Sequence, residues 1–199
     1  TECNLLERED VAVDIANGVV RYSPNIKMEN YPIVQELKNR VPVKNVFVEN
    51  DANAAALAEA KAGAGKGLDD VGMITLGTGV GGGIVIGGKL YSGFNYAGAE
   101  LGHTVIEFGG RQCNCGRKGC WEQYASATAL ISQTKEAMLG DKESKMWQLV
   151  NGNIDAASGR TAFDAMRLGD ETAKKVVDNY IYYVAVGVIN IINTFQPEF

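Results

Sequence analysis

Four side chains that bind zinc well lie within eighteen consecutive residues of the sequence. They are the only histidine of the chain and three of its four cysteines: His103, Cys113, Cys115 and Cys120. A structural zinc site takes four nitrogen or sulfur ligands at about 2.0–2.3 Å and leaves no coordination position open. Two glycines between the second and third of these cysteines allow the backbone to turn tightly, so that the thiolates can converge on one ion. The sequence therefore predicts a tetrahedral zinc site in a loop that folds around its metal.

Two other interpretations of this loop stay open. A disulfide is one, but no signal-peptide pattern is visible, and in a reducing compartment closely spaced thiols indicate metal binding more often than a bridge. A small nucleic-acid-binding zinc module is the other, because Arg111, Arg117 and Lys118 lie in the same loop. Three basic residues on an acidic chain are a weak electrostatic basis for binding nucleic acid. We expect a cytoplasmic protein that binds no nucleic acid.

Composition limits the remaining classes of protein. With 199 residues, of which 46% are hydrophobic, the chain can form one large or two small domains with a proper core. Its net charge of −5 disfavours non-specific attraction to nucleic acid or anionic membranes, so small molecules or proteins are the expected partners. The most apolar run, residues 180–195, contains two asparagines and is shorter than the about 20 residues of a membrane span. We expect a buried helix there and no membrane.

A second candidate site lies at Asn50 and Asp51. Residues 46–49 have the character of a buried strand, and residues 52–62 have high helix propensity. In open α/β sheets, ligands bind where the carboxyl end of a strand meets the start of a helix. Asp51 could instead cap the helix, a role worth about 1 kcal/mol. Taken alone, the position favours capping.

A third candidate is the glycine-rich turn at residues 77–83, between strands predicted at Val71–Leu76 and at residues 84–86. Successive backbone N–H groups in such a turn can hold phosphate oxygens, and Thr78 adds a hydroxyl. The turn is neither a dinucleotide-binding fingerprint nor a Walker loop, because no helix pattern follows it and the lysine of a Walker loop is missing. Tight packing of the sheet without any ligand explains the glycines equally well.

The start of the chain predicts a hairpin of residues 11–15 and 19–22, joined by a turn at Asn17 and Gly18. A short helix should follow from Pro32 to about Arg40, with Val34 and Leu37 on its inner face. Glycines at residues 63–67 indicate a hinge, and a short strand at residues 89–92 should complete the second sheet.

Beyond the cysteine loop the sequence predicts helices only. They cover residues 126–139, 142–150, 161–168 and 170–195. Thr161 and Asp164 have the spacing of a capping box. Apolar residues recur in the last helix at positions 173, 177, 181, 184, 188, 192 and 195, which predicts a stripe facing the core.

The order of four motifs resembles the ROK family of sugar kinases and repressors. The motifs are Asn-Asp-Ala-Asn-Ala-Ala at residues 50–55, the turn at 77–83, Glu-Leu-Gly-His at 100–103, and the cysteine segment 113–122. The resemblance extends from about Asn17 to Phe199, and the spacing of the histidine and cysteines is its most specific element. Within the family, residues 93–100 are most similar to bacterial ATP-dependent glucokinases.

This resemblance implies roles for individual residues. Asp51 would be the general base that takes the proton from the 6-hydroxyl of glucose as that hydroxyl attacks the γ-phosphate of ATP. The residues implied to bind sugar are Asn50, Asp51, Glu100, His103 and Glu122. Those implied to contact ATP, which carries Mg²⁺, are Gly77, Thr78, Gly79 and Gly81. The implied ligands of a structural Zn²⁺ are His103, Cys113, Cys115 and Cys120, with the second ring nitrogen of His103 facing the sugar.

The resemblance also implies an α/β fold of the actin-like, ribonuclease-H-like type, in which two lobes close over a cleft. Residues 1–66 would form the remainder of the sugar-side lobe, and residues 67–199 the lobe with the phosphate-binding hairpin, zinc loop and C-terminal helices. The family's first phosphate loop, Asp-x-Gly-Gly-Thr, is absent, and the chain stops soon after Pro197. We therefore expect an incomplete fold, truncated at both ends, with weak or no kinase activity of this chain alone.

Other functions stay open beside a glucokinase-type enzyme. One is the sugar-sensing domain of a ROK transcriptional repressor, which would share the sugar pocket and zinc loop. A kinase for another hexose, such as N-acetylmannosamine, mannose or fructose, is a second, and a zinc-stabilised interaction module without sugar affinity is a third. Asp51 favours the kinase, because a catalytic base is useful only where phosphate is transferred. A homodimer is expected from the family.

Overall fold

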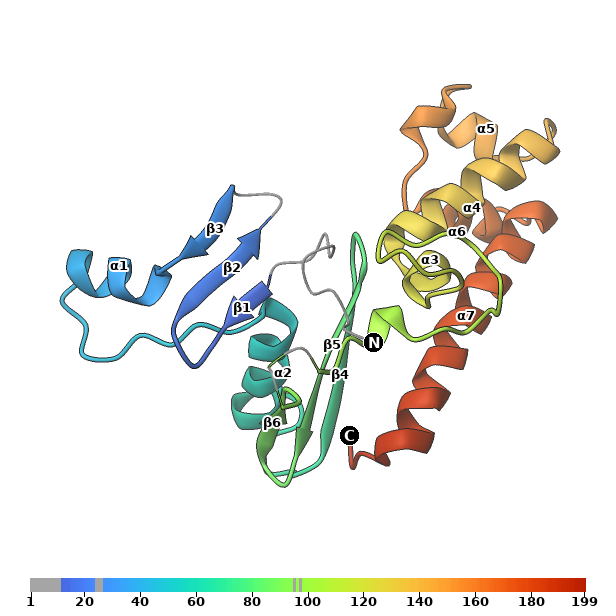
Figure 1. Cartoon of the computed structure of the whole chain (residues 1–199). Helices are drawn as coiled ribbons and strands as arrows, with labels where there is room; N and C mark the ends of the chain where they lie inside the picture. Colours follow the sequence, from blue (N-terminus) through green and yellow to red (C-terminus); the bar gives the residue numbers. More distant parts are fainter. Residues whose placement is uncertain (1–11, 24–26, 95, 97) are drawn as a thin grey trace.

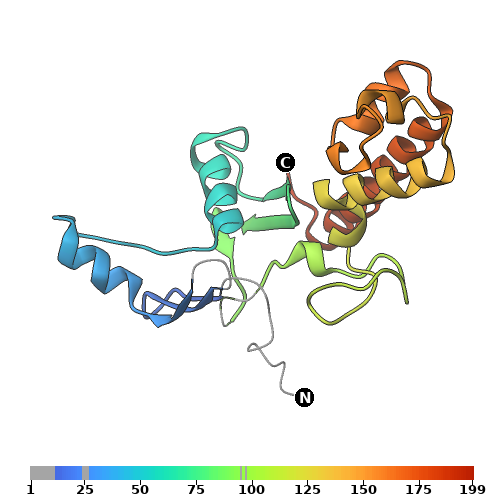
Figure 2. The same ribbon diagram turned by 90° about the horizontal axis from the view of Figure 1, so that it is seen from above.

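The computed structural model describes residues 12–23, 27–94, 96 and 98–199. Val11, Asn95 and Ala97, which belong to predicted segments, and the first ten residues lie outside the described residues. Two small antiparallel sheets and a group of helices follow one another along the chain (Figure 1). Figure 2 shows the first sheet with the helix that follows it at one end, the helices of the last third of the chain at the other end, and the second sheet between them.

The first sheet contains β1 (Ala12–Asp14), β2 (Val19–Ser23) and β3 (Met28–Tyr31) in that order. The predicted hairpin is confirmed, with Gly18 at φ +67° in its turn, whereas β3 was not predicted. Helix α1 (Ile33–Arg40) follows as expected, and the backbone N–H of Val34 donates to the Gly18 carbonyl at 3.1 Å. The inner-face prediction is wrong for Leu37, which is 41% exposed.

Residues 41–50 contain no helix or strand, so the predicted strand at 46–49 is wrong. Phe47 is 88% exposed, and no strand of the described ranges pairs with this segment. A strand needs a hydrogen-bonded neighbour, and an apolar run that lacks one has no reason to become extended and buried. This connection leads directly into α2 (Asp51–Ala62), which confirms the helix predicted at 52–62 and begins one residue earlier.

The second sheet contains β4 (Val71–Leu76), β5 (Val80–Ile86) and β6 (Lys89–Tyr91), in the order β4-β5-β6. The predicted bounds of β4 are confirmed. Ala60 of α2 packs with Val71 and Val85, which lie in β4 and β5. Helix α2 therefore covers one face of this sheet, although the predicted boundary at residue 66 groups it with the first lobe.

The predicted seven-residue glycine turn is wrong, because β5 begins at Val80 and includes three of its glycines. A Cβ at Gly83 would lie 2.5 Å from the Ala56 Cβ of α2, and one at Gly82 would lie 2.4 Å from Leu101 on the opposite face. Tight packing, the alternative interpretation, accounts for these glycines. The turn itself is Gly77, Thr78 and Gly79.

After the cysteine loop, which starts with the 3-10 helix η2 (Leu101–His103), every further element of the chain up to Phe195 is a helix. The elements are α3 (Glu122–Ala125), α4 (Ala127–Gly140), α5 (Met146–Leu149), the 3-10 helix η3 (Ile154–Ala156), α6 (Thr161–Arg167) and α7 (Glu171–Phe195). Their buried side chains form the largest core cluster, which includes Leu130, Met138, Met146, Val150, Ala162, Ala165, Ala173, Val176 and Val177.

The predicted capping box at the start of α6 is wrong. The Thr161 hydroxyl accepts from the Ser158 N–H at 3.0 Å, upstream of the helix. The Asp164 carboxylate binds the Arg167 guanidinium at 2.6 Å. Both side chains are therefore committed to other partners.

Helix α7 is only partly buried. Ala173 and Val177 of the predicted stripe are buried, but Ile181 and Ile192 are about half exposed, and Ile191 is buried instead. By length and composition α7 could cross a membrane, and 17% of its most apolar window is buried. The expectation of a buried helix is therefore wrong for most of this apolar part of α7.

Candidate active site

The start of α2 presents a carboxylate beside a fixed amide. The Asn50 side chain caps the helix, because its Oδ1 accepts the N–H groups of Ala52 at 2.9 Å and Asn53 at 3.2 Å. Glu49 Oε1 in turn accepts from Asn50 N at 3.0 Å and from Asn53 Nδ2 at 3.2 Å. The capping interpretation of Asp51 is thus wrong, because Asp51 is the first residue of the helix. It is exposed, and its Oδ1 accepts the N–H of Ala52 at 2.8 Å.

The start of α2 packs on β5 close to the turn between β4 and β5. A Cβ at Gly81 would be 3.1 Å from the Ala52 Cβ, so the residue after Asp51 packs against the second residue of β5. Thr78 at the tip of the turn is exposed, and the Gly77 N–H donates to the Gly79 carbonyl at 3.0 Å. The structure therefore brings Asp51 and the glycine turn to the same end of the sheet.

The turn is fastened from its other side by α3 and α4. The Val80 N–H donates to Glu122 Oε2 at 3.0 Å, and the Ala127 N–H donates to the Gly77 carbonyl at 2.8 Å. Glu122, which was predicted to bind sugar, thus holds the backbone of the predicted phosphate turn.

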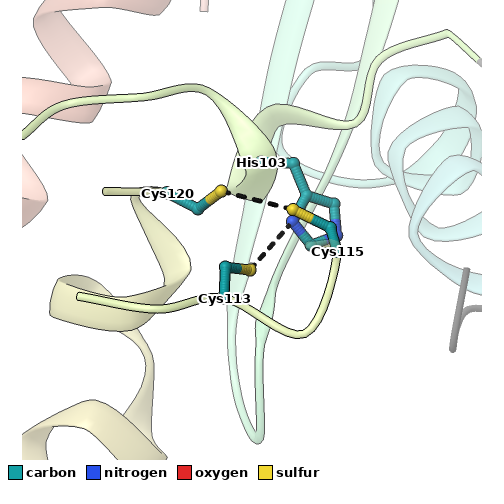
Figure 3. A group of neighbouring side chains, drawn as sticks. All are labelled: His103, Cys113, Cys115 and Cys120. Atoms are coloured by element: carbon teal, nitrogen blue, oxygen red, sulfur yellow. Dashed lines mark hydrogen bonds between the residues drawn. The ribbon is translucent and has the colours of Figure 1, made fainter. Parts of the chain in front are cut away.

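The predicted zinc ligands lie together (Figure 3). The ligand atoms of His103, Cys113, Cys115 and Cys120 are all within 4.8 Å of one another. Cys113 Sγ lies 3.6 Å from His103 Nδ1, and Cys115 Sγ lies 3.5 Å from Cys120 Sγ. Thiolates bound at about 2.3 Å to a tetrahedral zinc are about 3.8 Å apart, so the cluster has the donors and size to hold this ion.

Local backbone geometry explains why the loop folds this way. Gly119 has φ +83°, and a Cβ there would lie 1.8 Å from the Glu107 carbonyl oxygen. Gly116, at φ +84°, closes a turn in which its N–H donates to the Cys113 carbonyl at 3.0 Å. The Arg117 guanidinium donates to the backbone carbonyl of His103, which ties the far side of the loop to η2.

Electrostatics separate two of the thiols. Burial raises the pKa of Cys115, but hydrogen bonds from the Arg117 backbone N–H and the neighbouring thiols outweigh it and lower this pKa to about 7. At Cys120, burial and the neighbouring thiols raise the pKa to about 12. Since a metal binds thiolates, its binding to this cluster would release protons.

Two aromatic residues that the sequence analysis did not single out anchor the loop to α7. Trp121 is 0% exposed, its Nε1 donates to the Tyr183 carbonyl at 2.8 Å, and a Cβ at Gly187 would lie 1.9 Å from its indole. The Tyr124 hydroxyl accepts the Arg111 N–H at 2.7 Å. Their spacing of three residues, which places side chains on one helical face, was the signal available in the sequence.

The remaining predicted residues, Glu100 and His103, lie at the two ends of η2, which packs on the opposite face of β5 from α2. Glu100 precedes this short helix and accepts the His103 N–H on its carbonyl at 3.1 Å. A Cβ at Gly102 would be 2.0 Å from the Val80 carbonyl oxygen, so η2 packs directly on the start of β5. The contacts of α2, η2 and α3 thus converge on the first residues of β5 and the adjoining turn.

Comparison with known proteins identifies the relatives of this arrangement. Residues 12–199 match the ROK family. The chain is 43% identical over 188 residues to a glucokinase of Thermotoga maritima, covering 94% of this chain and 59% of that relative. It is 33% identical over 177 residues to a xylose repressor of Bacillus subtilis, covering 89% of this chain and 42% of the repressor.

A solved structure shares the fold. It is a ROK family glucokinase from Streptomyces griseus in complex with glucose and AMPPNP. The TM-score is 0.79 with 40% sequence identity, covering 93% of this chain and 60% of that chain. The chain thus spans about three fifths of the length of these glucokinases.

Proposed function

Because the chain belongs to the ROK family, we propose that it carries the sugar site and part of the nucleotide site of a glucokinase-type hexose kinase. The reaction is transfer of the γ-phosphoryl group of ATP to the 6-hydroxyl of glucose. The observation that carries this proposal is the exposed Asp51 at the start of α2, where the next residue packs on Gly81, close to the turn between β4 and β5. The glucokinase relatives, and the neighbour that holds glucose and AMPPNP, support the substrates.

The proposed chemistry needs positioning more than covalent participation. Phosphoryl transfer requires the attacking hydroxyl to be oriented and the phosphate charge to be neutralised. Asp51 Oδ2 accepts no hydrogen bond within the described part of the chain, so it is available for the 6-hydroxyl proton. Thr78 and Gly79 of the turn, with Gly77 and Gly81 on either side of them, would contact the phosphates. Mg²⁺ bound with ATP would supply charge neutralisation.

The sugar would be held by side chains that are fixed by other contacts. Asn50 uses its Oδ1 as the helix cap, which leaves the Nδ2 group to donate to a sugar hydroxyl. Glu100 and His103 would bind further hydroxyls from η2, and Glu122 would do so from α3. A structural Zn²⁺ on the cysteine cluster would fix the tautomer and direction of the His103 ring, since Nδ1 lies toward the thiols.

The test is calorimetric titration of the zinc-loaded chain with glucose, beside an assay for glucose 6-phosphate. Asp51→Asn should bind glucose within a few-fold of the wild type and lose about 10²–10⁴ of any phosphoryl transfer. Asp155→Asn, which changes an exposed carboxylate on η3, is the matched control and should change neither. Absence of saturable glucose binding by the zinc-loaded wild type would contradict the proposal.

A sugar-sensing domain is the second candidate, and the 33% identity to a xylose repressor favours it. Such a sensor binds sugar without transferring phosphate. Titration with xylose, N-acetylmannosamine, mannose and fructose beside glucose distinguishes the candidates: preference for xylose and no phosphoryl transfer would favour the sensor. A cytoplasmic location and a homodimer remain predictions.

A further inference from the structure

Glu122 lies between the predicted sugar-binding residues and the predicted phosphate turn. Its Oε2 accepts the Val80 N–H at 3.0 Å. A Cβ at Gly79 would lie 2.1 Å from the same oxygen, so the carboxylate lies directly against the backbone of the turn. The role that the resemblance implies, binding of a sugar hydroxyl, does not explain this contact.

The other carboxylate oxygen is available for a ligand. Glu122 Oε1 makes no hydrogen bond in the portion of the chain that is described. The preceding residue, Trp121, donates its N–H to the Thr104 carbonyl at 2.8 Å, directly after His103. One carboxylate can therefore accept from the turn and from a sugar at the same time, because its two oxygens offer about four acceptor positions.

Backbone contacts hold the two ends of the turn. The Ala127 N–H holds the Gly77 carbonyl at 2.8 Å, and Gly102 packs on the Val80 carbonyl oxygen. Val80 is itself buried. The Glu122 bond is the contact of this set that comes from a flexible side chain, so a ligand on this carboxylate can act on the Val80 N–H through it.

We propose that Glu122 is a positioning residue that couples sugar binding to order in the phosphate turn. A sugar hydroxyl on Oε1 fixes the side-chain torsions, and Oε2 then holds the Val80 N–H more persistently. The conformational entropy of the turn is then lost when sugar binds, before nucleotide binds. Nucleotide binding would cost less entropy afterwards, which makes the two ligands cooperative without a change of structure. This inference rests on the proposed function, because it takes the ligand to be a sugar.

Amide hydrogen exchange of Val80 in the full zinc-loaded chain, with and without saturating glucose, tests the coupling. In the wild type, glucose should slow exchange at this N–H about fivefold or more. Glu122→Gln replaces one carboxylate oxygen with an NH2 group that cannot accept, so the side chain no longer accepts from sugar and turn through two oxygens, and the glucose effect should weaken. Glu136→Gln, on α4, is the matched control and should keep the wild-type response.

Gly79→Ala provides a second variant in case Glu122→Gln does not fold. Its Cβ displaces the carboxylate from the turn but leaves Glu122 itself in place, so glucose should bind while the effect on Val80 is lost. If the wild type binds glucose and Val80 exchange stays unchanged, the coupling is overturned but the proposed function is not. The same holds if glucose slows Val80 exchange in the variants as much as in the wild type. Absence of glucose binding to the wild type overturns the proposed function and, with it, the coupling.

Discussion

The first sheet with α1 and the region from η2 to α7 are built in opposite ways. Among residues 13–21, 23 and 27–50, whose side chains the structure describes, Val20 is the single buried apolar side chain, and α1 has no buried residue. From η2 onward, fully buried side chains such as Trp121, Met138 and Val177 tie the loop and helices together. The first region is held by turn geometry and strand pairing, and the second by packing.

This difference has an energetic consequence. An isolated eight-residue helix is marginal in water, so α1 depends on the neighbours that it contacts. Burial of apolar side chains stabilises by about 1.5–3 kcal/mol for each large residue. Equivalent substitutions should therefore have large effects from η2 to α7 and small effects in residues 12–50.

The largest effect is expected for Trp121→Ala. This change removes a fully buried indole and leaves a cavity between the loop and α7, which should cost about 3–5 kcal/mol of unfolding free energy. Urea unfolding measures it. Phe47→Ala, at an exposed aromatic residue of the connection before α2, is the control and should change stability by less than about 0.5 kcal/mol. Similar losses in the two variants would remove the contrast between the regions.

Zinc removal should come next. Zinc at a hundredfold excess over its dissociation constant should add about 2.7 kcal/mol, which a chelator reverses. Cys120→Ser should abolish this gain, and Cys3→Ser, which keeps all four predicted ligands, should retain it. Hydrogen exchange after chelation should speed up in residues 101–125 and stay unchanged in residues 12–50. Equal acceleration in both would show that they unfold together.

Asp170 gives a smaller, pH-dependent effect. Burial raises the pKa of this carboxyl, but hydrogen bonds from Ala173 N, Lys145 N and the Ser144 hydroxyl outweigh it and hold the pKa below its ordinary 3.8. A carboxyl whose pKa is lower in the folded than in the unfolded state stabilises the fold at pH values above its unfolded-state pKa. This stabilisation is lost as the pH falls through the folded-state pKa. Asp170→Asn should therefore cost about 1–2 kcal/mol at pH 7 and progressively less below about pH 4. Urea unfolding from pH 7 to 2.5 measures this, and a pH-independent difference would contradict it.

The smallest effect is expected in α1. Arg40→Ala removes the bond to Glu36, an exposed pair one helical turn apart, and should cost about 0.3–0.5 kcal/mol. Thermal unfolding with Lys38→Ala, which removes a neighbouring charge without a described ion pair, is the comparison. A loss above about 1 kcal/mol for Arg40→Ala would mean that α1 packs more firmly than its exposure indicates.

The sequence predicted correctly those elements that are bounded by turn-forming residues or marked by an unusual residue spacing. The bounds of β4 follow from Asp70 before it and Gly77 after it, and the cysteine cluster follows from its unusual ligand spacing. The strand predicted at 46–49 failed because pairing depends on a distant partner, which a local run of apolar residues does not contain. The cap at Asn50 instead of Asp51 was equally beyond the sequence, since both residue types cap well.

Glycine was the residue type that the sequence could not resolve. It suits a turn as well as a strand packed closely on both faces, and Gly81, Gly82 and Gly83 proved to be the second case. The Glu122 contact with Val80 was invisible for another reason, because 42 residues separate its partners and no pattern connects them.

The three-glycine segment of β5 has a consequence for sequence variation. A methyl group at Gly82 would lie 2.4 Å from Leu101 of η2, and one at Gly83 would lie 2.5 Å from Ala56 of α2. Even an alanine at either position would therefore push η2 or α2 away from β5. In a saturation library selected for sugar binding, these positions should reject every substitution, although none of them carries a functional group. This part of β5 thus separates α2 from η2 by the thickness of the backbone alone, and these positions are constrained because they have no side chain.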